Sequence, residues 1–184
     1  MRILKLILVL SLFIFSSCND GKKDAEDTKM NEQAKAAEKA ENMRQSMLNT
    51  NKDLFKAWND KDKKLMSSHL VEDFERYANG KKEFTGRDQY LAMMDSLNTA
   101  FPGFEIIDKG NTRAFGNKTY GAFVFSGTNE GNFMGNPPTG KKADVEGYAI
   151  WTFNDEGKAV SEEVYFDRLD WITQLGYETS PPKK

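Results

Sequence analysis

The sequence predicts an α+β domain in which helices lie on one face of an antiparallel sheet. Apolar residues recur with a helical period of about 3.6 as far as Phe101, and with a period of two beyond Pro102. Short segments rich in Asn and Gly, at 109–111, 116–117 and 154–157, separate the alternating runs. Consecutive strands on short turns pair antiparallel, so we expect helices first and then a sheet.

The N-terminus has the layout of an exported protein. Residues 1–17 read MRILKLILVLSLFIFSS, with the cations Arg2 and Lys5 before an apolar run. That is the pattern of a signal peptide, and the run is too short to span a membrane. The following cysteine, Cys18, is the only one in the chain. Ser16-Ser17-Cys18 resembles the lipobox of bacterial lipoproteins, in which the cysteine is acylated after cleavage. We therefore expect a lipid-anchored protein of the cell envelope, on the outer membrane or the periplasmic face.

The region between Cys18 and the folded domain is charged and then helical. Residues 19–30 have almost no apolar content, which favours a flexible segment. Residues 31–59 show helical spacing, at first only through alanines, so residues 18–41 are assigned as a flexible or helical tether. The domain is then expected over 42–178, followed by a polar tail at 179–184.

The remaining elements follow from caps, breakers and alternation. A short helix is expected through Leu70, and another begins at the capping sequence Thr85–Asp88 and is stopped by Pro102. A last helix is expected over 168–175. The alternating runs, rich in β-branched and aromatic residues, predict strands at 104–107, 112–115, 119–128, 143–153 and 160–166.

Charge and composition exclude several functions. The chain has 26 basic and 28 acidic residues, and this mildly acidic balance argues against nucleic-acid binding. With one histidine, His69, and one cysteine that is expected to carry lipid, no metal site is predicted. We expect no cofactor.

Several motifs point to a known family. Residues 125–141 read FSGTNEGNFMGNPPTGK. Towards the end of the expected domain follow Phe153…Gly157-Lys158, then Asp167, then Gln174-Leu175-Gly176. These segments, with the Phe101-Pro102-Gly103-Phe104 turn, resemble SnoaL-like polyketide cyclases (ester cyclases) over residues 45–177. The resemblance implies the cone-shaped α+β barrel of the nuclear transport factor 2-like superfamily, with helices packed on a curved sheet that encloses a pocket.

The resemblance also implies a chemistry. SnoaL-like cyclases close a ring by intramolecular aldol condensation without metal or cofactor, using an aspartate as general base, and the matching residue here is Asp167. Such a base needs an apolar pocket that raises its pKa. The alternative is that Asp167 caps the helix that follows it, where backbone N–H groups stabilise the anion. The sequence leaves both roles open.

Two family positions differ in this chain. The family's histidine is Asn129 here, which can hydrogen-bond a carbonyl but cannot relay protons. The family's tryptophan, four residues before the aspartate, is Glu163. Strand alternation places Glu163 and Asp167 on one face, either as a carboxylate pair in the pocket or with Glu163 solvated at its rim.

The pocket is expected to be aromatic, and its use is left open. Trp58, Tyr77, Tyr90, Tyr148 and Trp151 are the candidate wall residues, and the loop 131–140 is either a lid or an ordinary hairpin connection. Three hypotheses follow: a cofactor-free cyclase or isomerase, a binding module for a small apolar molecule, or an interaction protein that forms homodimers through its outer sheet face. We favour a pocket for a small, largely apolar molecule, with catalysis undecided.

Overall fold

The computed structural model describes residues 20–178 and residue 180. The predicted signal peptide and Cys18 lie outside the described residues, as does most of the polar tail. Among the described helices, none has the length and apolar content needed to span a membrane. Contacts divide the chain into a unit that ends at Glu38 and a unit covering Lys39–Lys184. The second unit carries the sheet, the core and the cavities.

The described residues form four helices: α1 Asp20–Asp60, α2 Lys63–His69, α3 Arg87–Ala100 and α4 Arg168–Gln174. Helix α1 begins at Asp20, so the tether expected at 18–41 is helical over the residues described. The reason is that Lys, Glu and Ala favour helix even when they bury nothing. Asp62 caps α2, since its carboxylate accepts a hydrogen bond of 2.9 Å from the Leu65 N–H.

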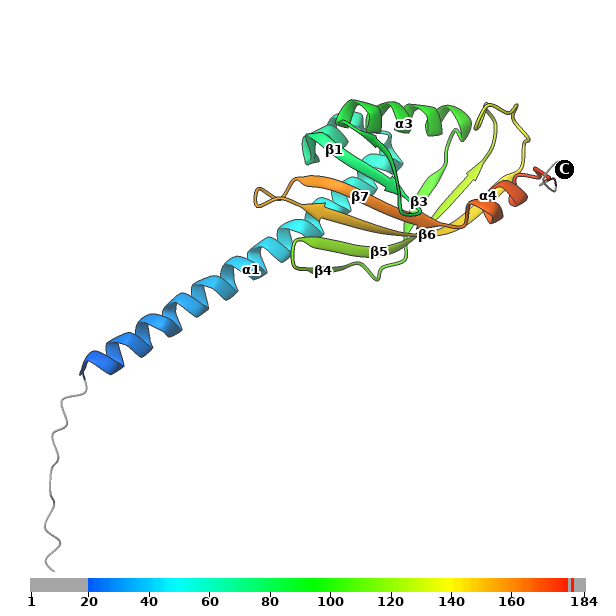
Figure 1. Ribbon diagram of the computed structural model, residues 1–184. Coiled ribbons are helices and arrows are strands. Elements are labelled where there is room, and N and C mark those ends of the chain that lie inside the picture. The colour runs from blue at the N-terminus through cyan, green and yellow to red at the C-terminus, as the bar shows by residue number, and fades with distance from the viewer. Residues whose placement is uncertain (1–19, 179, 181–184) are drawn as a thin grey trace, which may run out of the picture. The chain divides into compact units, whose positions relative to one another are not determined.

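Seven strands in the described part of the chain form one curved sheet. They are β1 Leu70–Ala78, β2 Lys81–Thr85, β3 Glu105–Asp108, β4 Arg113–Phe115, β5 Lys118–Thr128, β6 Lys142–Phe153 and β7 Ala159–Phe166. Their order is β2-β1-β7-β6-β5-β3, with β4 paired to β5. The α+β class, the helices on one sheet face and the five strands from β3 to β7 are confirmed (Figure 1).

Two parts of the sheet differ from the prediction. Strands β1 and β2 lie where no strand was expected, and β1 pairs with β7 in parallel, so the sheet is mixed rather than antiparallel. The pairing of β1 with β7 joins segments that are far apart in the sequence. No short turn marks such a neighbour, and alternation alone does not show which strands meet.

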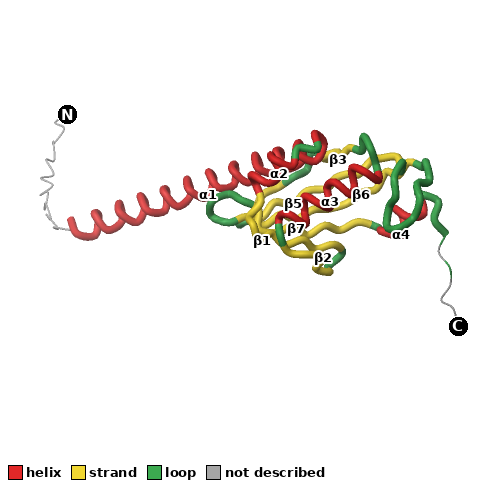
Figure 2. The backbone as a smooth tube through the Cα atoms, turned by 90° about the horizontal axis from the view of Figure 1, so that it is seen from above, coloured by secondary structure: helices red, strands yellow, loops and turns green. Residues whose placement is uncertain are grey.

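Strand alternation divides the sheet into an inner and an outer face. On β6 the odd-numbered residues Val145, Ala149 and Trp151 are buried on the inner face, while Tyr148 is exposed on the outer one. On β7 the inner face carries Glu162 and Val164. Helix α3 covers the inner face, as the view from above shows (Figure 2). The large, fully buried core side chains between helices and sheet are Met47, Leu54, Met66, Leu70, Phe74, Tyr90, Met94, Phe101, Phe104, Val145, Phe153 and Leu175.

Candidate functional site

An inner cavity lies within the core, between helices and sheet. Its volume is about 80 Å³. Arg76 and Glu162 are its only charged lining residues in the described part of the chain. The apolar wall comes from α1, α3, α4 and the inner sheet face, with the residues Leu54, Phe55, Trp58, Leu97, Ile106, Phe123, Phe125, Val145, Ala149, Trp151, Val164, Phe166 and Trp171. An aromatic, apolar wall with one polar cluster is the usual composition of a small-molecule site.

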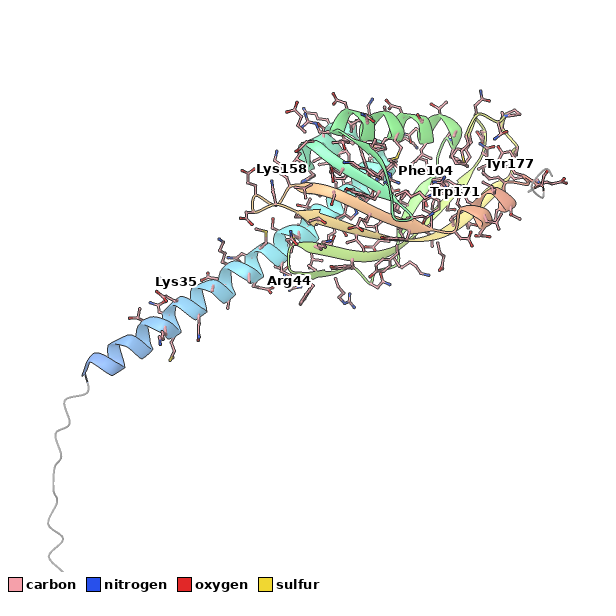
Figure 3. The ribbon with its side chains drawn as sticks, in the orientation of Figure 1. Lys35, Arg44, Phe104, Lys158, Trp171 and Tyr177 are labelled. Atoms are coloured by element: carbon pink, nitrogen blue, oxygen red, sulfur yellow. The ribbon has the colours of Figure 1, made fainter. Side chains whose placement is uncertain are left out.

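An outer cavity of about 390 Å³ adjoins the inner one. The two share the lining residues Arg76, Leu97, Phe166 and Trp171. Figure 3 shows Trp171 and Phe104 between α3 and the sheet. The residues that line only the outer cavity are Glu83, Phe84, Met93, Phe133, Met134, Arg168 and Ile172. A molecule too large for the inner cavity can therefore extend along these shared residues into the outer one.

The polar cluster of the inner cavity is a buried hydrogen-bonded network. Arg76 and Glu162 are neighbours on the parallel strands β1 and β7, and the Arg76 Nη1 donates to the Glu162 carboxylate. The Tyr90 hydroxyl donates to the same carboxylate over 3.2 Å, and accepts from the Trp58 Nε1 over 3.1 Å. The side chains of Arg76 and Glu162 are only 11% and 7% exposed. Paired charges and satisfied donors make this burial tolerable.

Tyr90 is held in its neutral form. Burial raises the pKa of its hydroxyl to about 12, against the smaller opposing effect of the nearby Arg76 charge. The phenol therefore keeps its proton across the physiological pH range and can continue to donate it to Glu162.

The loop between β5 and β6 forms part of the wall of the outer cavity. Its Phe133 ring packs against Phe101 at 4.9 Å and against Trp171 at 5.1 Å between centroids. Gly131 lets the loop approach α3, since a Cβ there would stand 2.1 Å from the Thr99 carbonyl oxygen. Phe133 and Met134 of the loop 131–140 thus line the outer cavity, and the role of the loop as a lid stays a prediction.

Asn129 holds this loop and lines neither cavity. It is fully buried, and its amide Nδ2 donates to the carbonyls of Ala100 at 3.1 Å and Gly131 at 2.8 Å. Its Oδ1 accepts from the Thr139 N–H at 2.9 Å. Its side chain is therefore committed to the backbone of the loop, so the sequence-based placement in the pocket is not what the structure shows.

Asp167 is exposed and lines neither cavity. Its Oδ1 accepts a hydrogen bond of 2.9 Å from the Asp170 N–H at the start of α4, which is the cap geometry. Of the two roles left open by the sequence, the structure displays the cap.

Three other predicted pocket residues lie on the outer sheet face. Glu163 accepts from the Tyr165 hydroxyl at 3.3 Å, Tyr77 donates to Glu75 at 2.7 Å, and Tyr148 is 42% exposed. They line neither cavity. Trp58 and Trp151 do line the inner cavity as predicted, and Tyr90 belongs to its polar cluster. A homodimer through the outer face stays a prediction.

Sequence reasoning missed Arg76 and Glu162. A signal for Glu162 was present, because it shares its parity on the strand with Val164 and Phe166, which identify the core face. For Arg76 no signal was available, since its strand was not predicted. Within the part of the chain that the structure describes, no cluster of His, Cys, Asp and Glu side chains is suited to holding a metal ion.

Comparisons with known proteins agree on the type of fold. The family model described as SnoaL-like polyketide cyclase matches residues 49–175. A protein from Jannaschia sp. CCS1 assigned as a SnoaL-like polyketide cyclase is 22% identical, with a TM-score of 0.67 over 76% of this chain and 96% of that one. TsrD from Streptomyces laurentii is 20% identical, with a TM-score of 0.65 over 72% and 96%. An epoxide hydrolase of M. tuberculosis is 14% identical, with a TM-score of 0.59 over 72% and 90%. No curated protein matches the chain significantly.

Proposed function

The chain belongs to the SnoaL-like polyketide cyclase family, and from this premise we propose that it binds a small, largely apolar molecule in its two adjoining cavities. The observation that carries the proposal is the inner cavity, whose aromatic and aliphatic wall surrounds a single buried polar cluster. Transfer of apolar surface from water into such a wall drives binding, and the polar cluster orients the ligand.

Filling the inner cavity is expected to weaken binding. Ala149 lines the cavity and is 6% exposed, so Ala149→Leu places three extra carbons in the space that the ligand needs. We expect the affinity for the apolar dye Nile red to fall about tenfold or more, which corresponds to about 1.4 kcal/mol. Dye fluorescence titration measures it.

The matched control is Ala122→Leu on the neighbouring strand. Ala122 pairs with Tyr148 and therefore faces the outer side of the sheet. This variant should bind the dye as the original protein does. Unchanged binding in Ala149→Leu, in a protein with a normal thermal unfolding transition, would contradict a ligand in the inner cavity.

A second candidate function is a cofactor-free proton transfer of the cyclase or isomerase type. Glu162 favours it, because this carboxylate lies in the wall of an apolar cavity beside the Tyr90 hydroxyl. If Glu162 is the base, an enolisable ketone bound in the cavity should gain deuterium from D2O, as followed by NMR. Glu162→Gln should abolish this exchange and Asp167→Asn should not. The reverse result would make Asp167 the base.

We propose further that the protein is exported and anchored to a membrane through Cys18. The support is the Ser16-Ser17-Cys18 junction behind an apolar segment. Cys18→Ala should leave the chain unprocessed or free of the membrane fraction, since a thiol is required for lipidation. Fractionation with mass spectrometry checks it, and Ser17→Ala, which keeps the thiol, is the control. Normal processing and membrane partition of Cys18→Ala would refute the anchor.

A further inference from the structure

A partly exposed carboxylate separates two arginines at the wall of the outer cavity. Glu83 lies on β2, an edge strand, and accepts from the Arg76 Nε over 3.0 Å. Its other oxygen is 3.6 Å from the Arg168 Nη2. The Glu83 side chain is 32% exposed and that of Arg168 is 50% exposed. Because Glu83 already contacts water, it can turn outward at small cost, whereas Arg76 is 11% exposed and stays in place.

A second observation concerns Trp171, which lines both cavities. Its indole Nε1 is buried and has no hydrogen-bond partner among the described residues. A buried donor without an acceptor costs free energy, so an occupant of the cavity that offers an acceptor oxygen would remove that cost.

From these two observations we infer that the ligand is an apolar carboxylic acid whose carboxylate binds between Arg76 and Arg168, in the place that Glu83 now occupies. The inference rests on the ligand-binding function proposed above. The guanidinium fork suits a carboxylate. The two arginines now face two carboxylates, those of Glu83 and Glu162, and a ligand carboxylate in the place of Glu83 keeps this cluster of four charges neutral. The apolar body of the ligand then lies along the aromatic wall.

The unpaired indole decides against a cationic ligand. An ammonium group that displaced Arg168 from Glu83 would also preserve the neutrality of the cluster. It would bring only donors, however, and would leave the Trp171 N–H without an acceptor. An acid satisfies the two arginines and can offer an acceptor to the indole, which a cation cannot do.

The test compares octanoate, octanol and octylamine by isothermal titration calorimetry on the full chain. These probes share the apolar tail and differ in the head group. Octanoate should bind about tenfold more tightly than octanol, since hydrogen bonds to charged groups are the stronger ones. Octylamine should bind most weakly.

Three substitutions then assign the head group to its site. Glu83→Gln removes the competing charge and should tighten octanoate binding without changing that of octanol. Arg168→Gln should weaken octanoate alone, with Arg113→Gln on β4 as the exposed control. Trp171→Phe keeps an aromatic ring but removes the N–H donor, so it should weaken the binding of octanoate and octanol more than that of octylamine.

The outcomes separate this inference from the function on which it rests. If octylamine binds as tightly as octanoate, or if Arg168→Gln leaves octanoate binding unchanged, the carboxylate site is wrong while the apolar cavity remains a binding site. If none of the three probes binds, both the carboxylate site and the proposed ligand-binding function are overturned.

Discussion

Arg76→Ala is expected to lower the free energy of unfolding by about 3–5 kcal/mol, the range for breaking a buried ion pair. The substitution leaves the Glu162 carboxylate, whose side chain is 7% exposed, without its cation in an apolar wall. It also removes the guanidinium that stands 5.7 Å from the centre of the Tyr90 ring. Urea unfolding followed by circular dichroism measures the loss.

Two controls identify the cause as an uncompensated buried charge. Arg168→Ala removes a half-exposed partner of Glu83 and should cost less than about 1 kcal/mol. The double variant Arg76→Met with Glu162→Leu removes both charges and should recover most of the stability, because apolar replacements of a buried pair are often neutral. A double variant as unstable as Arg76→Ala would show that packing, and not charge, explains the loss.

Phe101→Ala is expected to cost about 3–5 kcal/mol, the range for deleting a buried ring. Phe101 is fully buried, and its ring contacts three parts of the site. Its centroid lies 5.2 Å from Phe125 on the sheet, 4.9 Å from Phe133 in the loop and 6.0 Å from Trp171 on α4. Removal of the ring therefore also loosens the packing of Phe133 and Trp171, which line the outer cavity. Nile red binding should weaken together with the stability of the fold.

Phe115→Ala is the matched control for the ring. Phe115 on β4 is 82% exposed, so its removal should change the free energy of unfolding by less than about 0.5 kcal/mol. Equal urea midpoints for Phe101→Ala and the unsubstituted protein would contradict the role of Phe101 as the contact between sheet, loop and α4.

Much of the fold could be predicted because its signals are local. The α3 residues Tyr90 and Met94 repeat at helical spacing and are fully buried, as the pattern requires. The alternation along 143–153 predicted the strand β6, but Tyr148 and Trp151, both expected in the pocket wall, have opposite parity, and only Trp151 lies on the inner face. On β7, Glu163 has the parity of the outer face, whereas Glu162 shares the inner face with Val164. Glu163 was expected in the pocket because it occupies a family position, and such a match does not show which face of the strand is buried.

The sequence by itself determined the helix α3, the strands from β3 to β7, the aromatic core and the family, because periodicity, turn residues and motifs are properties of neighbouring residues. Only the tertiary structure decided the polar cluster of the cavity. Arg76 and Glu162 are 86 residues apart and meet because β1 lies parallel to β7. Tertiary structure also decided that Asp167 caps α4 outside the cavities. A residue's type and parity limit the face it occupies, but the strand that lies beside it depends on how the whole chain buries its apolar surface.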